Sequence, residues 1–99
     1  MPTKPELERA LEQRCVAKVE ARGGLALKLR PPTERGFFDR TALIPQYNAW
    51  FFEVKRVKGG KISSQQLRWQ VLLHQMGFGA YFIDTDEQFD AAMERELAR

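Results

Sequence analysis

The chain has 99 residues, enough for one domain around a single hydrophobic core and too few for two. Its 43% hydrophobic and 29% charged residues are typical of a soluble globular protein, and no apolar run approaches the length of a membrane helix. A single Cys15 excludes an internal disulfide and a cysteine-based zinc site, and the N-terminus lacks a signal-peptide segment, so we expect one cytosolic domain spanning residues 1–99 with a net charge of +3.

The first third of the chain predicts a helix followed by a strand. Over residues 6–22, apolar side chains recur every four positions, which is the spacing of one helix face. These side chains are Leu7, Leu11, Cys15 and Val19. Gly23-Gly24 ends the helix. Residues 25–30 then alternate as a strand does, until Pro31-Pro32 stops it.

Two more strands are predicted in the middle of the chain, after a loop over residues 33–38. The first covers residues 39–44 and the second covers residues 49–57. The second begins with the apolar run Trp50–Phe52, which is typical of a strand that is covered on both faces.

The last third predicts a helix, a strand and a final helix. The first of these helices begins after Ser63 and stops at Gly77, and Ser63 and Gln66 have the spacing of a capping box. A short strand covers residues 80–83, and residues 84–86 introduce the last helix. The order α-β-β-β-α-β-α predicts an α/β fold with a mixed sheet that is flanked by helices.

Charge is distributed unevenly along the chain. Residues 22–68 hold ten basic and three acidic side chains, whereas residues 69–99 hold two basic and six acidic ones. A basic segment suits a polyanion such as a DNA backbone, because cationic side chains release the counterions condensed on it. A merely solvated basic surface stays open as the alternative, since proximity in sequence is not clustering in space.

Two acidic residues and a lysine stand out on the two middle strands. Asp39 opens the first, and Glu53 and Lys55 lie two positions apart on the second, so both point to one face. Charged side chains rarely adjoin a core-building run unless they are paired or bind a metal. Two carboxylates on neighbouring strands can chelate a hard cation such as Mg²⁺, and a lysine beside them can orient water or stabilise a phosphate. The combination predicts metal-dependent cleavage of a phosphodiester.

Each of these residues also has a plainer interpretation. Asp39 can be a strand-start aspartate that backbone amides satisfy. Glu53 and Lys55 can form an ordinary ion pair on a strand, worth about 0–1 kcal/mol. The apolar run before Glu53 argues against a fully exposed strand.

A wider set of residues follows a fixed order along the chain: Glu12, Gly23-Gly24, Gly36-Phe37-Phe38-Asp39-Arg40, Glu53-Val54-Lys55, Gly59-Gly60, Ser63-Ser64-Gln65-Gln66 and Gly77. In this order they resemble the PD-(D/E)XK nucleases, and among them the VRR-NUC group of virus-type replication-repair nucleases. The resemblance spans about residues 8–84. One residue departs from it, because Phe38 stands where the family usually has proline, which restricts the backbone before the aspartate.

The resemblance implies a restriction-endonuclease-like α-β-β-β-α-β core with an added C-terminal helix. The catalytic residues that it implies are Asp39, Glu53, Lys55, Glu12 and Gln66. The ligands that it implies for Mg²⁺ or Mn²⁺ are Asp39, Glu53, the carbonyl of Val54, and Glu12 either directly or through water. Glu8, one turn earlier on the same helix face, is the alternative to Glu12. For Gln66, a role in the capping box and a role in the active site do not exclude one another.

Basic residues near the motif are expected to contact DNA phosphates, with solvation as the alternative for each. They are Lys58, Lys61, Arg35, Arg40 and Arg56. The sequence contains neither a phosphate-binding Walker loop nor a dinucleotide-binding glycine pattern, so we expect no nucleotide cofactor. We expect no membrane partner either.

Taken together, we expect a metal-dependent, structure-specific DNA endonuclease. It resembles the stand-alone phage and bacterial members that are similar to Holliday-junction resolvases and act as homodimers. A two-fold dimer supplies two active sites for the two symmetric incisions of a four-way junction. The alternatives are a flap or nicking nuclease, and a non-catalytic nucleic-acid-binding module on a nuclease scaffold.

Overall fold

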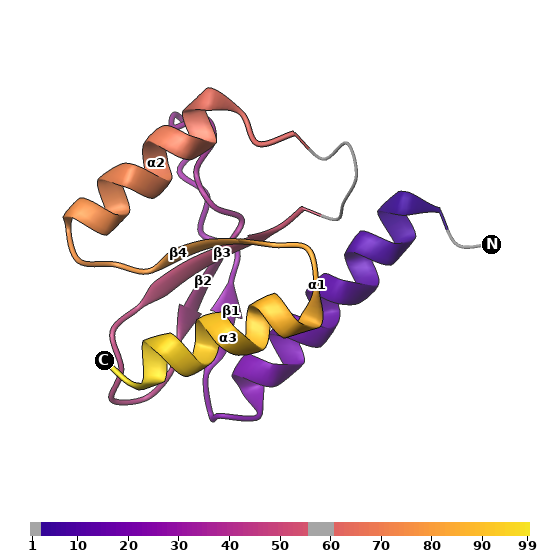
Figure 1. Ribbon diagram of the computed structural model, residues 1–99, viewed down its shortest axis with the longest axis vertical. Coiled ribbons are helices and arrows are strands. Elements are labelled where there is room, and N and C mark those ends of the chain that lie inside the picture. The colour runs from indigo at the N-terminus through magenta and orange to yellow at the C-terminus, as the bar shows by residue number, and fades with distance from the viewer. Residues whose placement is uncertain (1–2, 56–60) are drawn as a thin grey trace.

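The computed structural model describes residues 3–55 and 61–99. This part of the chain forms four strands and three helices in the predicted order (Figure 1). The elements are α1 (Lys4–Glu20), β1 (Leu25–Leu27), β2 (Arg40–Leu43), β3 (Trp50–Val54), α2 (Ser64–Gln75), β4 (Ala80–Ile83) and α3 (Asp86–Leu97). None of these helices is both long and apolar enough to cross a membrane.

The strands form one mixed sheet in the order β1-β2-β3-β4. The first three strands are consecutive in the chain and pair as antiparallel neighbours, which needs no crossover helix. β4 lies parallel to β3, and a parallel neighbour requires a crossover connection, which α2 provides. The expected α/β fold with a mixed sheet is therefore confirmed.

The helices cover the two faces of the sheet in an uneven way. α2 lies on one face, and α1 and α3 lie on the other (Figure 1). Successive residues of β3 alternate between these faces. Phe52 packs with residues of α1 and α3, whereas Glu53 bonds to a residue of α2. The alternation therefore directs Glu53 to the α2 face.

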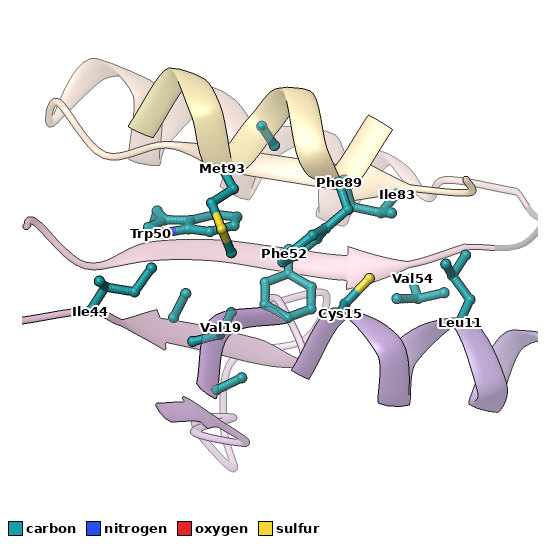
Figure 2. Packing of buried hydrophobic residues seen from close by; sticks show 13 residues of the cluster. Leu11, Cys15, Val19, Ile44, Trp50, Phe52, Val54, Ile83, Phe89 and Met93 are labelled. Carbon is teal, nitrogen blue, oxygen red and sulfur yellow. The ribbon is translucent and has the colours of Figure 1, made fainter. Parts of the chain in front are cut away.

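The main core lies between the sheet and the pair α1 and α3 (Figure 2). The side chains predicted to line the inner face of α1 at Leu11, Cys15 and Val19 are all buried. Aromatic rings of β3 and α3 meet there, with the Phe52 and Phe89 centroids 5.0 Å apart. Burial raises the pKa of the Cys15 thiol to about 12, so this residue is a small apolar core side chain.

Ion pairs hold α3 beside α1. Asp86 pairs with Arg14 at 3.0 Å and with Lys18 at 3.2 Å, and Asp90 pairs with Lys18 at 2.8 Å. The bond from Arg14 lowers the pKa of Asp86. These contacts are largely exposed, so they orient the two helices more than they stabilise the fold.

A second, smaller core lies under α2. Its buried members are Phe38, Leu73 and Ala80, and its partly buried members are Phe37, Phe51, Trp69 and Phe82. Phe38 stacks on Phe82 with centroids 4.9 Å apart. This cluster fixes the loop that precedes β2, and thereby the residue that follows Phe38.

Several predicted boundaries differ from the observed ones. α1 begins at Lys4, because Thr3 and Glu6 form a capping box before it. β1 ends at Leu27 instead of residue 30, and positions 29 and 30 would face residues 39 and 38, which precede β2 and are not strand. β3 ends at Val54, and the predicted positions 56 and 57 lie outside the described residues.

Candidate active site

Asp39 directly precedes β2, one residue before the strand begins, and Glu53 lies near the end of the adjacent strand β3. Arg40 stands opposite Phe52 in this antiparallel pair, so the same register continued by one position sets Asp39 opposite Glu53. Residues directly opposite one another share a face, with Cβ atoms about 5 Å apart. The charge of Asp39 is the second cause, after burial, of a raised pKa of Glu53. The two carboxylates are therefore close enough for the charge of Asp39 to act on Glu53.

Glu53 is buried, with only 7% of its surface exposed. Two donors approach the same oxygen, Oε2: the amide Nε2 of Gln66 donates to it at 2.6 Å, and the ammonium of Lys55 lies 3.3 Å away. In residues 3–55 and 61–99, no donor bonds to Oε1 of Glu53. One oxygen thus orients the carboxylate, and the other remains available to a cation.

Gln66 joins the first turn of α2 to this carboxylate. Its side-chain oxygen accepts a bond from the backbone amide of Ser63 at 2.9 Å, and the Ser63 hydroxyl accepts from the amide of Gln66 at 3.1 Å. The same side chain donates through Nε2 to Glu53. Both roles considered for Gln66 are therefore geometrically compatible, since the capping box uses the oxygen and the contact with Glu53 uses the nitrogen.

Gly36 and Phe38 hold the loop that precedes Asp39 against α2. Gly36 has φ +78°, a conformation that glycine adopts without strain. A Cβ at Gly36 would lie 2.8 Å from Cβ of Gln65, so only glycine lets the loop approach the helix start so closely. Phe38, which stands in place of the family proline, is 1% exposed and anchors the loop through its ring.

Arg30 is a site residue that the sequence analysis missed. Its Nη1 lies 3.1 Å from Oδ1 of Asp39. Arg30 comes from the segment between β1 and β2, within the stretch predicted as strand, and no motif includes it. The excess of cations in residues 22–68 was the only hint, and it does not single out one arginine.

Glu12 and Arg40 pair with each other on the opposite face of the sheet. Nε of Arg40 donates to Oε2 of Glu12 at 2.7 Å, and Nη1 donates to the carbonyl of Ala26 at 2.9 Å. Arg40 directly follows Asp39, so strand alternation turns its side chain toward α1. The structure thus places Glu12 with Arg40, and no described contact joins it to Asp39 or Glu53. Glu8, the alternative to Glu12, lines a cavity of about 490 Å³ together with Glu12 and Arg40.

The basic side chains predicted to contact DNA differ in their exposure and in the partners that they already have. Arg35 and Lys61 are exposed, and the carbonyl of Arg35 accepts a bond from the Trp69 indole at 3.1 Å. Arg40 is engaged by Glu12 and is only 20% exposed, so it is poorly placed to reach a phosphate. Arg56 and Lys58 lie outside the described residues.

The donor set fits a hard divalent cation. Asp39 and Glu53 supply carboxylate oxygens, and the backbone carbonyl of Val54 lies beside them in the chain. Within residues 3–55 and 61–99, no group of three or more His, Cys, Asp or Glu side chains gathers as a metal site. A pair of carboxylates is what Mg²⁺ commonly takes from a protein, because this ion keeps several waters and also binds substrate phosphate.

The Glu53→Gln variant should remove a pH dependence from the stability of the metal-free protein. The pKa of Glu53 is raised by burial and by Asp39, so the folded state binds this proton more readily than the unfolded chain. Its contribution to stability is therefore present at low pH and is lost as the pH rises through the folded-state pKa. Urea unfolding at a series of pH values should show the wild type losing stability relative to the variant. A constant difference would contradict the raised pKa.

Comparison with known proteins identifies the fold. A solved structure described as a VRR_NUC domain superposes with a TM-score of 0.80 and 27% sequence identity, over 89% of this chain and 95% of that one. No protein-family model and no curated protein matches the sequence. The chain thus has a VRR-NUC fold, as the motif resemblance predicted, and this similarity implies a nuclease of the PD-(D/E)XK type.

Proposed function

We propose that this chain is a DNA endonuclease that hydrolyses phosphodiester bonds at the Asp39–Glu53 pair with Mg²⁺ or Mn²⁺. One observation carries the proposal. In a VRR-NUC fold, a buried glutamate stands beside an aspartate on the neighbouring strand, and a lysine and a glutamine approach its Oε2. An ordinary surface ion pair would not explain the burial of Glu53 or its second donor.

Asp39, Glu53 and the carbonyl of Val54 are the groups that would hold the cation. When bound, a divalent metal lowers the pKa of a coordinated water and neutralises charge on the scissile phosphate. Gln66 keeps the Glu53 carboxylate in a fixed orientation through its bond to Oε2. A fixed orientation matters because a preorganised site needs no rearrangement during the reaction.

Lys55 is the positively charged side chain that lies beside Glu53. Its side chain is 25% exposed, so the ammonium reaches solvent while it stays 3.3 Å from Glu53. The backbone amide of Lys55 bonds to the carbonyl of Ile83 at 2.8 Å, which fixes the start of the side chain at the edge of the sheet. From there Lys55 can orient an attacking water or stabilise charge that develops on the phosphate.

Branched DNA is the substrate that we propose, cut by a homodimer. A four-way junction needs two symmetric incisions, and a two-fold dimer presents two equivalent active sites. Arg35 and Lys61 are exposed and belong to the two segments that border α2 at its start, so they are the described cations that we assign to phosphate contacts. Arg56 and Lys58 complete the proposed set.

The purified protein should cut a labelled four-way junction in the presence of Mg²⁺ or Mn²⁺ and leave it intact in EDTA. The measurement is a gel assay on four-way, flap, nicked and linear DNAs with each divalent metal, beside light scattering to obtain the oligomeric state. Paired, symmetric incisions by a dimer support the resolvase-like activity. A monomer that makes one nick per junction supports a flap or nicking nuclease instead. Binding without cleavage under every metal condition would leave a non-catalytic module.

A further inference from the structure

Arg30 is a cation of the site that the proposed chemistry does not use. Its guanidinium lies 3.1 Å from Asp39. Its charge also lowers the pKa of Glu53, although burial and Asp39 together raise it. Arg30 therefore acts electrostatically on both carboxylates, and it reaches them from the loop after β1.

The ion pair between Arg30 and Asp39 is exposed enough to break at small energetic cost. The Arg30 side chain is 60% exposed and that of Asp39 is 34% exposed, whereas Lys55 pairs with a glutamate that is only 8% exposed. Ion pairs in contact with water contribute little, because solvent replaces either partner at small cost. Of the two cations at the site, Arg30 is thus the one that can leave its carboxylate easily.

The net charge of the site becomes positive when a metal binds. Among the described residues of the metal-free protein, each carboxylate has one cation beside it, Arg30 for Asp39 and Lys55 for Glu53, so these charges cancel. A divalent cation on the two carboxylates supplies the same positive charge again. Arg30 then lies beside a site with a net positive charge, which repels it. The phosphates of DNA can replace Asp39 as its negatively charged partner.

We propose that Arg30 exchanges partners, pairing with Asp39 in the metal-free protein and with a DNA phosphate beside the cleaved bond once Asp39 and Glu53 hold a divalent cation. This inference rests on the proposed function. A guanidinium suits the second partner, because its planar fork of donors binds phosphate through two parallel bonds. The exchange couples metal binding to DNA binding at one residue.

The first test measures metal binding without DNA. Mn²⁺ is titrated calorimetrically into the wild type, Arg30→Ala and the control Arg22→Ala, which removes an exposed arginine from the turn after α1. Arg30→Ala should bind Mn²⁺ about two- to fivefold more tightly, the range that corresponds to the loss of one exposed ion pair. Arg22→Ala should bind Mn²⁺ as the wild type does.

The second test measures DNA binding with and without metal. The affinity for a labelled four-way junction is followed by fluorescence anisotropy over a salt series, in EDTA and in Ca²⁺, at times when a gel shows the DNA intact. In Ca²⁺, Arg30→Ala should bind about tenfold more weakly, and the slope of log affinity against log salt should fall by about one unit. In EDTA, Arg30→Ala and the wild type should bind alike. Arg30→Lys keeps the charge without the fork, so it should restore the slope and part of the affinity.

The outcomes separate this inference from the proposed function. A wild type that binds no Mn²⁺ overturns both. A wild type that binds Mn²⁺ and cuts DNA, with Arg30→Ala unchanged in both measurements, overturns the exchange alone. Tighter Mn²⁺ binding with unaltered DNA binding also overturns it, because Arg30 would then only neutralise Asp39. An equal loss of DNA affinity in EDTA and Ca²⁺ overturns it as well, since Arg30 would contact DNA regardless of metal.

Discussion

Asp39→Ala and Lys55→Ala should each lower the rate of DNA cleavage by about a hundredfold to a thousandfold or more, while the protein stays folded. Groups that stabilise developing charge in a dry site typically account for this range. Asp39 supplies one of the two carboxylates in the proposed metal pair, and Lys55 places an ammonium 3.3 Å from the other. The measurement is the single-turnover rate on a labelled junction at saturating Mg²⁺ or Mn²⁺.

The two inactive variants should differ in their affinity for metal. Asp39→Ala removes a proposed ligand, so its affinity for Mn²⁺ in calorimetry should drop. Lys55→Ala removes a charge next to Glu53 without removing an oxygen donor, so Mn²⁺ should still bind. The matched controls are Glu94→Ala, an exposed carboxylate on α3, and Lys28→Ala, an exposed lysine after β1. Both controls should cut at the rate of the wild type.

Loss of cleavage counts only if folding persists. The Arg30–Asp39 pair is exposed, so Asp39→Ala should cost at most about 1 kcal/mol of unfolding free energy. Thermal melts followed by circular dichroism measure this for every variant. Folded Asp39→Ala and Lys55→Ala proteins that cut at the wild-type rate would eliminate the proposed active site.

Phe38→Ala should lower the free energy of unfolding by about 3–5 kcal/mol, the usual cost of truncating a buried phenylalanine. The ring is 1% exposed, stacks on Phe82 at 4.9 Å and meets the Phe37 ring edge-on at 6.5 Å. In a domain of this size each kcal/mol lowers the melting temperature by about 4–8 °C. The measurement is urea unfolding, with Phe78→Ala as the matched control, because that side chain is 36% exposed and should cost far less.

Phe38→Pro tests why this chain lacks the proline of the family. Proline in a compatible backbone position stabilises by about 0.4–1 kcal/mol, which is much less than the burial of the ring contributes. We therefore expect Phe38→Pro to be less stable than the wild type even where its backbone fits. A variant as stable as the wild type would mean that the loop before Asp39 does not depend on the ring.

Local patterns were sufficient to predict the order of the elements. The four-residue repeat through Leu11, Cys15 and Val19 marks the buried face of α1, since helix periodicity alone determines which side chains share a face. The spacing of Ser63 and Gln66 likewise predicted a capping box that the structure contains. Strand ends were predicted less well, because pairing with a neighbouring strand decides them. β1 is paired with β2 only from Leu25 to Leu27, whereas its sequence alternates as far as residue 30.

Contacts between segments that are distant in the sequence limited how much of the candidate site could be predicted. Arg40 pairs with Glu12 on the other face of the sheet, a contact that no motif indicated. Strand alternation already contained this result, because Asp39 and Arg40 are adjacent in the chain and cannot point to the same side. Arg30 had no such indication, since its meeting with Asp39 depends on the path of the loop between β1 and β2.

The sequence by itself determined the element order and the buried face of α1, because periodicity and spacing act within a few residues, and it proposed Asp39, Glu53 and Lys55 as the site. Only the tertiary structure decided which polar and charged side chains meet across the chain, including Gln66 with Glu53, Arg30 with Asp39 and Glu12 with Arg40. The physical reason is that ion pairs and hydrogen bonds act over a few ångströms, and such distances are set by packing and not by position in the sequence.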